Sequence, residues 1–204
     1  MTIKKKHVVI PELQIRLIGD KILSQKAKEI QTVDESIQEL SQNLIDAMLK
    51  YDGLGLAATQ VGIPLRIIAL AIPKPDKNKG EEISPGEAFL FPMMPITIIN
   101  PKIISFSNET NTMEEGCLSV PGIFAEVKRP SKILIEGIIN LREKITIDCG
   151  GLLARALQHE IDHLDGILFI QRLDKKQLSK IKKKLEILKK EAEKTNYIRL
   201  KKNE

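Results

Sequence analysis

The chain has 204 residues, of which 42% are hydrophobic, and its formal net charge is +5 at pH 7. This length suffices for one sizeable hydrophobic core, so we expect residues 1–204 to form a single domain. We find no apolar run long enough to span a membrane, and two cysteines are too few for a disulfide framework. The composition therefore favours a cytoplasmic protein over a disulfide-rich secreted protein or a membrane protein.

A helix is predicted in the first quarter of the chain. Thr32 followed three residues later by Glu35 has the pattern of a capping box, and apolar residues then recur at helical spacing. The pattern continues to about Lys50, and Gly53 is well placed to end the helix. We therefore expect a helix over residues 32–50.

A run of small residues follows this helix. Residues 53–60 read GLGLAATQ, in which only Gln60 has a long polar side chain. Such a run lets the backbone come close to a neighbouring group. Residues 67–72 are apolar and β-branched and predict a buried strand, whereas residues 73–95, rich in Pro, Gly and charge, predict a long surface excursion.

The middle of the chain is predicted to consist of strands. Apolar or alternating stretches separated by polar turns lie at residues 96–104, 113–121, 124–127, 133–139 and 144–148. Together with the helices, they predict an α+β fold with mixed or antiparallel strands.

A second helix is predicted after a Gly-Gly break at residues 150–151, and it contains two of the three histidines. Residues 158–166 read QHEIDHLDG, which places His159 and His163 four residues apart on one helix face. Glu160 follows the first histidine and can approach a water bound to a shared metal ion without being a ligand. This pattern is typical of a hydrolytic metal site, so we expect the strands to pack around this central helix.

A catalytic metal site of this kind needs a third protein ligand. The candidates are His7, Cys117 and Cys149, and spacing alone does not choose between the two thiols, because either could be a small buried hydrophobe. The motif itself also has other interpretations. It could be a pair of core histidines, a zinc endopeptidase site with a distal third ligand, or a structural metal site in a binding protein without catalysis.

The C-terminal segment carries most of the positive charge. Residues 174–204 contain twelve Lys or Arg against five acids, a local charge of +7 that leaves −2 for the rest of the chain. Leucine and isoleucine recur there at helical steps, which predicts an amphipathic helix at about residues 175–197. The lysines either solvate one face of this helix or bind a polyanion.

Three separated motifs resemble, in this order, the signature motifs of peptide deformylases. They are GLGLAATQ at residues 53–60, EGCLS at 115–119 and QHEIDHL at 158–164. The resemblance covers roughly residues 17–173, without the 73–95 insertion and the basic tail. It implies a metal-dependent hydrolase that removes the N-formyl group from the N-terminal methionine of new polypeptides and releases formate.

The resemblance also implies residue roles. Cys117, His159 and His163 would hold one divalent metal ion, Fe²⁺ in the cell, with Zn²⁺, Ni²⁺ or Co²⁺ as alternatives. Glu160 would transfer the proton, and the Gln60 amide and the Leu118 backbone N–H would stabilise the oxyanion. Further roles follow for residues around these: Leu54, Gly55, Met113 and Leu152 in substrate binding, and Glu115 with Arg129 in orienting the ligands.

The implied partners are N-formylmethionyl nascent peptides. The basic C-terminal helix could contact the ribosome, and we expect no interaction with DNA or a membrane. Besides the insertion at residues 73–95, which would lie at the rim of the site, the chain departs from the family pattern at two places. Phe124 stands near the position where some members carry a substrate-binding arginine, and the predicted turn at residues 140–143 lacks the usual glycine.

Overall fold

The protein is described here by a computed structural model that covers residues 13–74 and 83–195. Five antiparallel strands form one sheet in the order β1-β2-β3-β6-β7, and β4 and β5 form a separate two-stranded sheet. The strands are β1 (Gly55–Ala57), β2 (Ile67–Leu70), β3 (Ile96–Phe106), β4 (Thr110–Cys117), β5 (Val120–Pro130), β6 (Ile133–Ile139) and β7 (Glu143–Cys149). The helices are α1 (Glu35–Lys50), α2 (Pro85–Leu90), α3 (Gly151–Leu164) and α4 (Lys175–Thr195).

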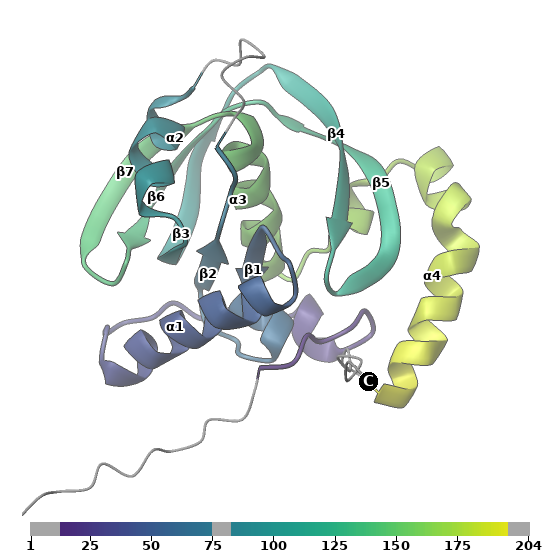
Figure 1. The fold of residues 1–204 in the computed structure, drawn as a ribbon. Coiled ribbons are helices and arrows are strands. Elements are labelled where there is room, and N and C mark those ends of the chain that lie inside the picture. The colour runs from purple at the N-terminus through teal and green to yellow at the C-terminus, as the bar shows by residue number, and fades with distance from the viewer. Residues whose placement is uncertain (1–12, 75–82, 196–204) are drawn as a thin grey trace, which may run out of the picture.

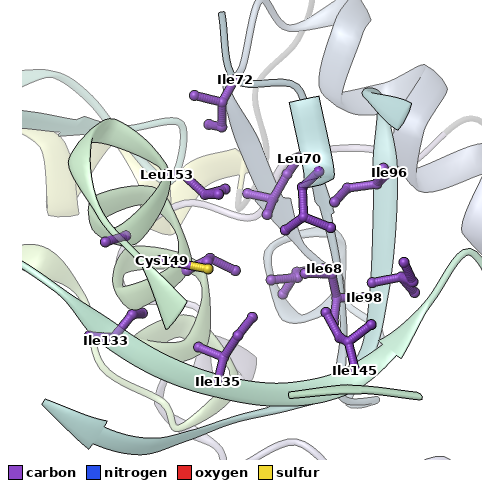
Figure 2. Packing of buried hydrophobic residues seen from close by; sticks show 14 of the residues in the cluster. Ile68, Leu70, Ile72, Ile96, Ile98, Ile133, Ile135, Ile145, Cys149 and Leu153 are labelled. Atoms are coloured by element: carbon purple, nitrogen blue, oxygen red, sulfur yellow. The ribbon is translucent and has the colours of Figure 1, made fainter. Parts of the chain in front are cut away.

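Helix α3 lies at the centre of the molecule, between the five-stranded sheet and the β4–β5 hairpin (Figure 1). Its apolar face packs on one face of the sheet, and α1 covers the opposite face. Strand β2 is buried on both faces, with Ile68 and Leu70 toward α3 and Ile67 and Ala69 toward α1. Figure 2 shows the α3 side of this core, where Leu153 of α3 lies beside Leu70 of β2.

This architecture confirms the predicted α+β class, with antiparallel strands around the helix that carries both histidines and with a C-terminal helix. The strands predicted at residues 133–139 and 144–148 correspond to β6 and β7. Their turn has Asn140 and Leu141 in the left-handed region, with φ of 43° and 68°. Two non-glycine residues thus accommodate the turn in which the expected glycine is absent.

The start of α1 differs from its prediction. Asp34, not Thr32, is the N-cap, and its carboxylate accepts hydrogen bonds from the Ile37 backbone N–H and the Ser36 hydroxyl. At the other end Asp52, with φ of 54°, adopts the left-handed conformation that we expected of glycine. The Gly53 N–H then donates to the Met48 carbonyl, which closes the helix end.

The segment predicted as a surface excursion, residues 73–95, is only partly on the surface, so that prediction was wrong for its second half. Residues 75–82 lie outside the described part. Helix α2 follows, capped by Ser84 and Glu87, and Leu90 and Phe91 at its end are buried in the core beside β7. The insertion thus contributes two large apolar side chains to the main core.

Helix α4 packs against the outer face of the hairpin (Figure 1). Leu185 and its neighbours contact Val120, Ile123 and Val127 of β5. The helix is described to Thr195, so the predicted end at residue 197 lies outside the described residues. Within the described part of the chain, we find no helix that is both long and apolar enough to cross a membrane.

The core predicts a test on one strand. Ile98 of β3 is fully buried between sheet and α3, whereas Ile104 of the same strand is 45% exposed. Ile98→Ala should lower the free energy of unfolding by about 2–5 kcal/mol, because it leaves a cavity in the core. Ile104→Ala is the matched control and should lower the free energy of unfolding by less than about 1 kcal/mol. Urea denaturation measures both values. Equal losses in the two variants would contradict this assignment of the core.

Candidate active site

Three metal-ligating side chains meet at the end of β4 and the middle of α3. Cys117 is the last residue of β4, and His159 and His163 lie one turn apart on α3. Their potential ligand atoms all lie within 4.8 Å of one another, and the Cys117 Sγ to His163 Nε2 distance is 3.2 Å. Both histidines are buried, and their ring centroids are 4.9 Å apart.

This group fits a divalent transition metal. One thiolate and two imidazoles are donors that zinc, iron, cobalt and nickel accept, and three protein ligands leave a position for water or substrate. Cys149, the other candidate thiol, is buried at the end of β7 outside this group, and burial raises its pKa to about 12. The third candidate, His7, lies outside the described residues.

Glu115 fixes the orientation of the first histidine. One of its carboxylate oxygens, Oε2, lies 2.9 Å from His159 Nδ1, which leaves Nε2 of that ring for a metal. Arg129 donates to both oxygens of the same carboxylate, at 2.6 and 2.9 Å. Burial alone would raise the pKa of Glu115, but the hydrogen bonds from His159 and Arg129 hold it well below its usual range.

Two further charged residues of α3, Arg155 and Asp162, belong to this network, and no role was predicted for them from the sequence. Arg155 of α3 donates to Glu115 Oε1 at 2.7 Å, and Asp162 accepts from Arg129 at 2.7 Å and from Arg172. A usable signal was present. Arg155 precedes His159 by four residues, so it had to lie on the same buried face of the helix as the histidines.

Glu160 lies beside the three ligands and is only 5% exposed. Its Oε2 atom has no hydrogen-bond partner among the described residues. Burial raises the pKa of Glu160 to about 7, and the nearby charge of His159 offsets only part of that rise. A side chain on Gly55 would overlap this carboxylate, so the small-residue loop brings its backbone against Glu160.

Gln60 lies in a short 3₁₀ helix directly after β1, at Ala58–Val61. Its side-chain oxygen accepts a hydrogen bond from the Ala57 backbone N–H at 2.9 Å, which fixes which end of the amide faces the site. The amide nitrogen lies 3.5 Å from Cys117 Sγ and 3.3 Å from the Ser119 hydroxyl. Leu118 lies in the turn between β4 and β5, next to Cys117, and lines a cleft together with Gln60 and Glu160.

A cleft of about 490 Å³ opens above these residues. Its walls include Leu54, Gly55 and Leu152, three of the residues predicted to bind substrate, and His159 and Glu160 also line it. Met113 is not among the residues that line the cleft and is partly exposed on β4. Phe124, in contrast, lines the cleft and is 61% exposed. It is the residue that stands near the position where some members of the family carry a substrate-binding arginine.

The comparisons with known proteins agree with this geometry. The family model for polypeptide deformylase matches residues 12–179. A peptide deformylase of Chlorobaculum parvum is 41% identical over 185 residues, which are 91% of this chain and 92% of that protein. One of Thermosynechococcus vestitus is 39% identical over 178 residues, 87% of each chain.

Solved structures lead to the same family. The crystal structure of peptide deformylase from Ehrlichia chaffeensis has a TM-score of 0.72 and 37% identity, covering 92% of this chain and 98% of that one. A plant peptide deformylase has a TM-score of 0.76 and 37% identity, with 91% and 94% covered. The chain therefore belongs to the polypeptide deformylase family.

Proposed function

We propose that Glu160, Gln60 and Leu118 carry the reaction of this peptide deformylase, the hydrolysis of the formyl group from an N-terminal methionine. The observation that supports this most strongly is the position of Glu160. Its carboxylate is buried beside the three ligating side chains, lines the cleft and has one oxygen without a partner among the described residues. A carboxylate in this position can move protons between a water molecule and a substrate nitrogen.

Cys117, His159 and His163 would hold the metal ion. When bound, such an ion supplies a Lewis acid that polarises a carbonyl group and makes water more acidic. Glu115 keeps the His159 ring in the orientation that this ligand set needs.

In the proposed mechanism, Glu160 takes a proton from the attacking water and later delivers it to the leaving amine. Negative charge develops on the formyl oxygen between these events and needs preorganised donors. The Gln60 amide is held toward the site by Ala57, and the Leu118 backbone N–H is the second donor that we propose. The products are formate and a free amino terminus.

The methionine side chain would occupy the cleft. Leu54 and Leu152 offer apolar surface there, and Gly55 lets the substrate backbone come close. Met113 is left out of this proposal, because it is not among the residues that line the cleft.

Replacing Glu160 by Gln tests its role while preserving the shape of the side chain. Formate release from a formyl-Met peptide should fall by about 10²–10⁴-fold, because the proton transfer is lost. The variant should still contain one metal ion per chain by elemental analysis. Glu126→Gln, at an exposed position of β5, is the control and should hydrolyse at the wild-type rate. Full hydrolytic activity of the Glu160→Gln protein would contradict the proton-transfer role proposed for Glu160.

We further propose Fe²⁺ as the ion used in the cell. The thiolate and imidazole donors also suit Zn²⁺, Co²⁺ and Ni²⁺, so the ligand set alone does not select one. Protein purified without oxygen should contain iron and lose its activity in air, because ferrous iron and the Cys117 thiolate are both open to oxidation. Stoichiometric zinc with undiminished activity in anaerobic preparations would contradict this assignment.

A cytoplasmic location and contact with the ribosome complete the proposal. Both cysteines are free, as expected in a reducing compartment. Helix α4 carries nine exposed lysines against three glutamates. Lys176, Lys183 and Lys190 recur every seven residues on the side opposite the buried Leu185, so they form a stripe that faces away from the protein. Such a stripe suits the phosphates of ribosomal RNA.

Reversing the charge of this stripe tests the contact without removing the helix from the hairpin. The triple variant K176E, K183E and K190E should lose salt-sensitive co-sedimentation with ribosomes and retain its activity on short formyl peptides. The matched variant K21E, K26E and K144E makes the same charge change at exposed positions elsewhere and should still co-sediment. If both triple variants co-sedimented with ribosomes as the wild type does, the lysines of α4 would only solvate the helix.

A further inference from the structure

We propose that Arg155 is a positioning residue that ties the cysteine side of the site to the histidine side and thereby sets the affinity for the metal. The proposal rests on the metal-holding role of Cys117, His159 and His163 proposed above. It concerns a residue of α3 that does not itself belong to the ligand set.

The three ligands come from two separate parts of the fold. Cys117 ends β4, in a two-stranded hairpin that is not hydrogen-bonded into the main sheet, and both histidines lie on α3. A hairpin of two strands has little stability of its own. Contacts with the rest of the protein therefore fix its position relative to α3. They include side chains that cross between the two, such as Gln158 of α3, whose Nε2 atom donates to the Pro130 carbonyl at 3.0 Å.

Arg155 makes this crossing at several points. It is 5% exposed, and its Nη1 atom donates to Glu115 Oε1 at 2.7 Å and to the Val127 carbonyl at 2.9 Å. Its Nη2 atom donates to the Asn111 carbonyl at 3.0 Å and also contacts the Asn111 side-chain oxygen. One side chain of α3 thus contacts β4 at two residues and β5 at a third.

Arg129 makes the reciprocal crossing. It starts on β5, binds Glu115 on β4 and reaches Asp162 on α3 at 2.7 Å. The two arginines cross between hairpin and helix in opposite directions and share the Glu115 carboxylate. Because that carboxylate also orients His159, movement of the hairpin would displace Cys117 and His159 relative to each other.

The geometry requires arginine at position 155. A guanidinium group has five N–H donors in one plane and can serve a carboxylate and two backbone carbonyls together. An ammonium group on a lysine is a point charge without this fork, so it cannot hold all these partners in the same positions. Without Arg155, Glu115 keeps Arg129 and His159, but the buried Val127 carbonyl and the Asn111 carbonyl lose this link to α3.

The test measures metal retention in full-length protein loaded with Co²⁺. The metal is transferred to a chelator of known affinity, and the visible absorption of the Co²⁺ protein reports the ligand geometry. Arg155→Met should raise the dissociation constant for Co²⁺ by about 10–100-fold, as expected for the loss of a group that orients ligands. Its absorption spectrum should differ from that of the wild type. The dissociation constant of Arg155→Lys for Co²⁺ should lie between those of the wild type and Arg155→Met.

Arg66 provides the matched control. It is also a buried arginine bound to one carboxylate and two carbonyls, those of Asp165, Leu164 and Pro101, and it does not contact Glu115. Arg66→Met should lower the melting temperature but leave the Co²⁺ spectrum unchanged and the dissociation constant within about twofold of the wild type, since the ligands keep their orientation. Wild-type spectra and affinities for both methionine variants would overturn the proposal, and so would equal changes in both.

If Arg155→Met does not fold, Arg155→Lys and Arg66→Lys decide the question. Weaker Co²⁺ retention by at least about threefold in Arg155→Lys alone supports the proposal, because lysine keeps the charge and loses the fork. Equal retention by the two lysine variants overturns it. These measurements involve no formyl peptide. Co²⁺ retention can therefore be interpreted even if the catalytic roles proposed for Glu160 and Gln60 are wrong.

Discussion

The site depends on a carboxylate that stays ionised inside the protein. Glu115 is 6% exposed, and an unpaired charge in such a place would be strongly destabilising. It is tolerated because Arg129, Arg155 and His159 donate to its two oxygens. The same contacts let Glu115 orient the His159 ring. A carboxylate that is bound by side chains from both α3 and β5 cannot shift unless those two elements also move. Charge pairing and ligand orientation are thus one physical arrangement.

A second constraint is the space around Glu160. The backbone of the loop before and within β1 approaches this carboxylate so closely that Gly55 has no room for a side chain. A side chain on Gly53 would in turn lie 3.1 Å from the Gly55 carbonyl oxygen and 3.2 Å from Leu118. Steric exclusion therefore explains both glycines of the first motif.

Local patterns predicted most of the elements that surround the site. The apolar stripe of α3 and the alternation in β6 and β7 were readable because each depends on near neighbours in the sequence. The burial of Leu90 and Phe91 was not readable, because it depends on packing beside β7 and α3, which begin only at residues 143 and 151. The start of α1 was misassigned because Thr32 and Asp34 are both suitable caps, and only the structure shows which side chain reaches a backbone N–H.

The hairpin explains why three distant motifs were needed to identify the site. Residues Gly116 and Cys117 lie at a register shift between β4 and β5, where an irregular strand can redirect a side chain. At this position the thiol lies beside Gln60 and His163 rather than continuing the strand pattern. The irregularity interrupts pairing in a sheet of only two strands, which has little stability of its own. Arg129 and Arg155, which are remote from Cys117 in sequence, join this hairpin to α3, so the position of the thiol beside the histidines depends on contacts that no local sequence pattern shows.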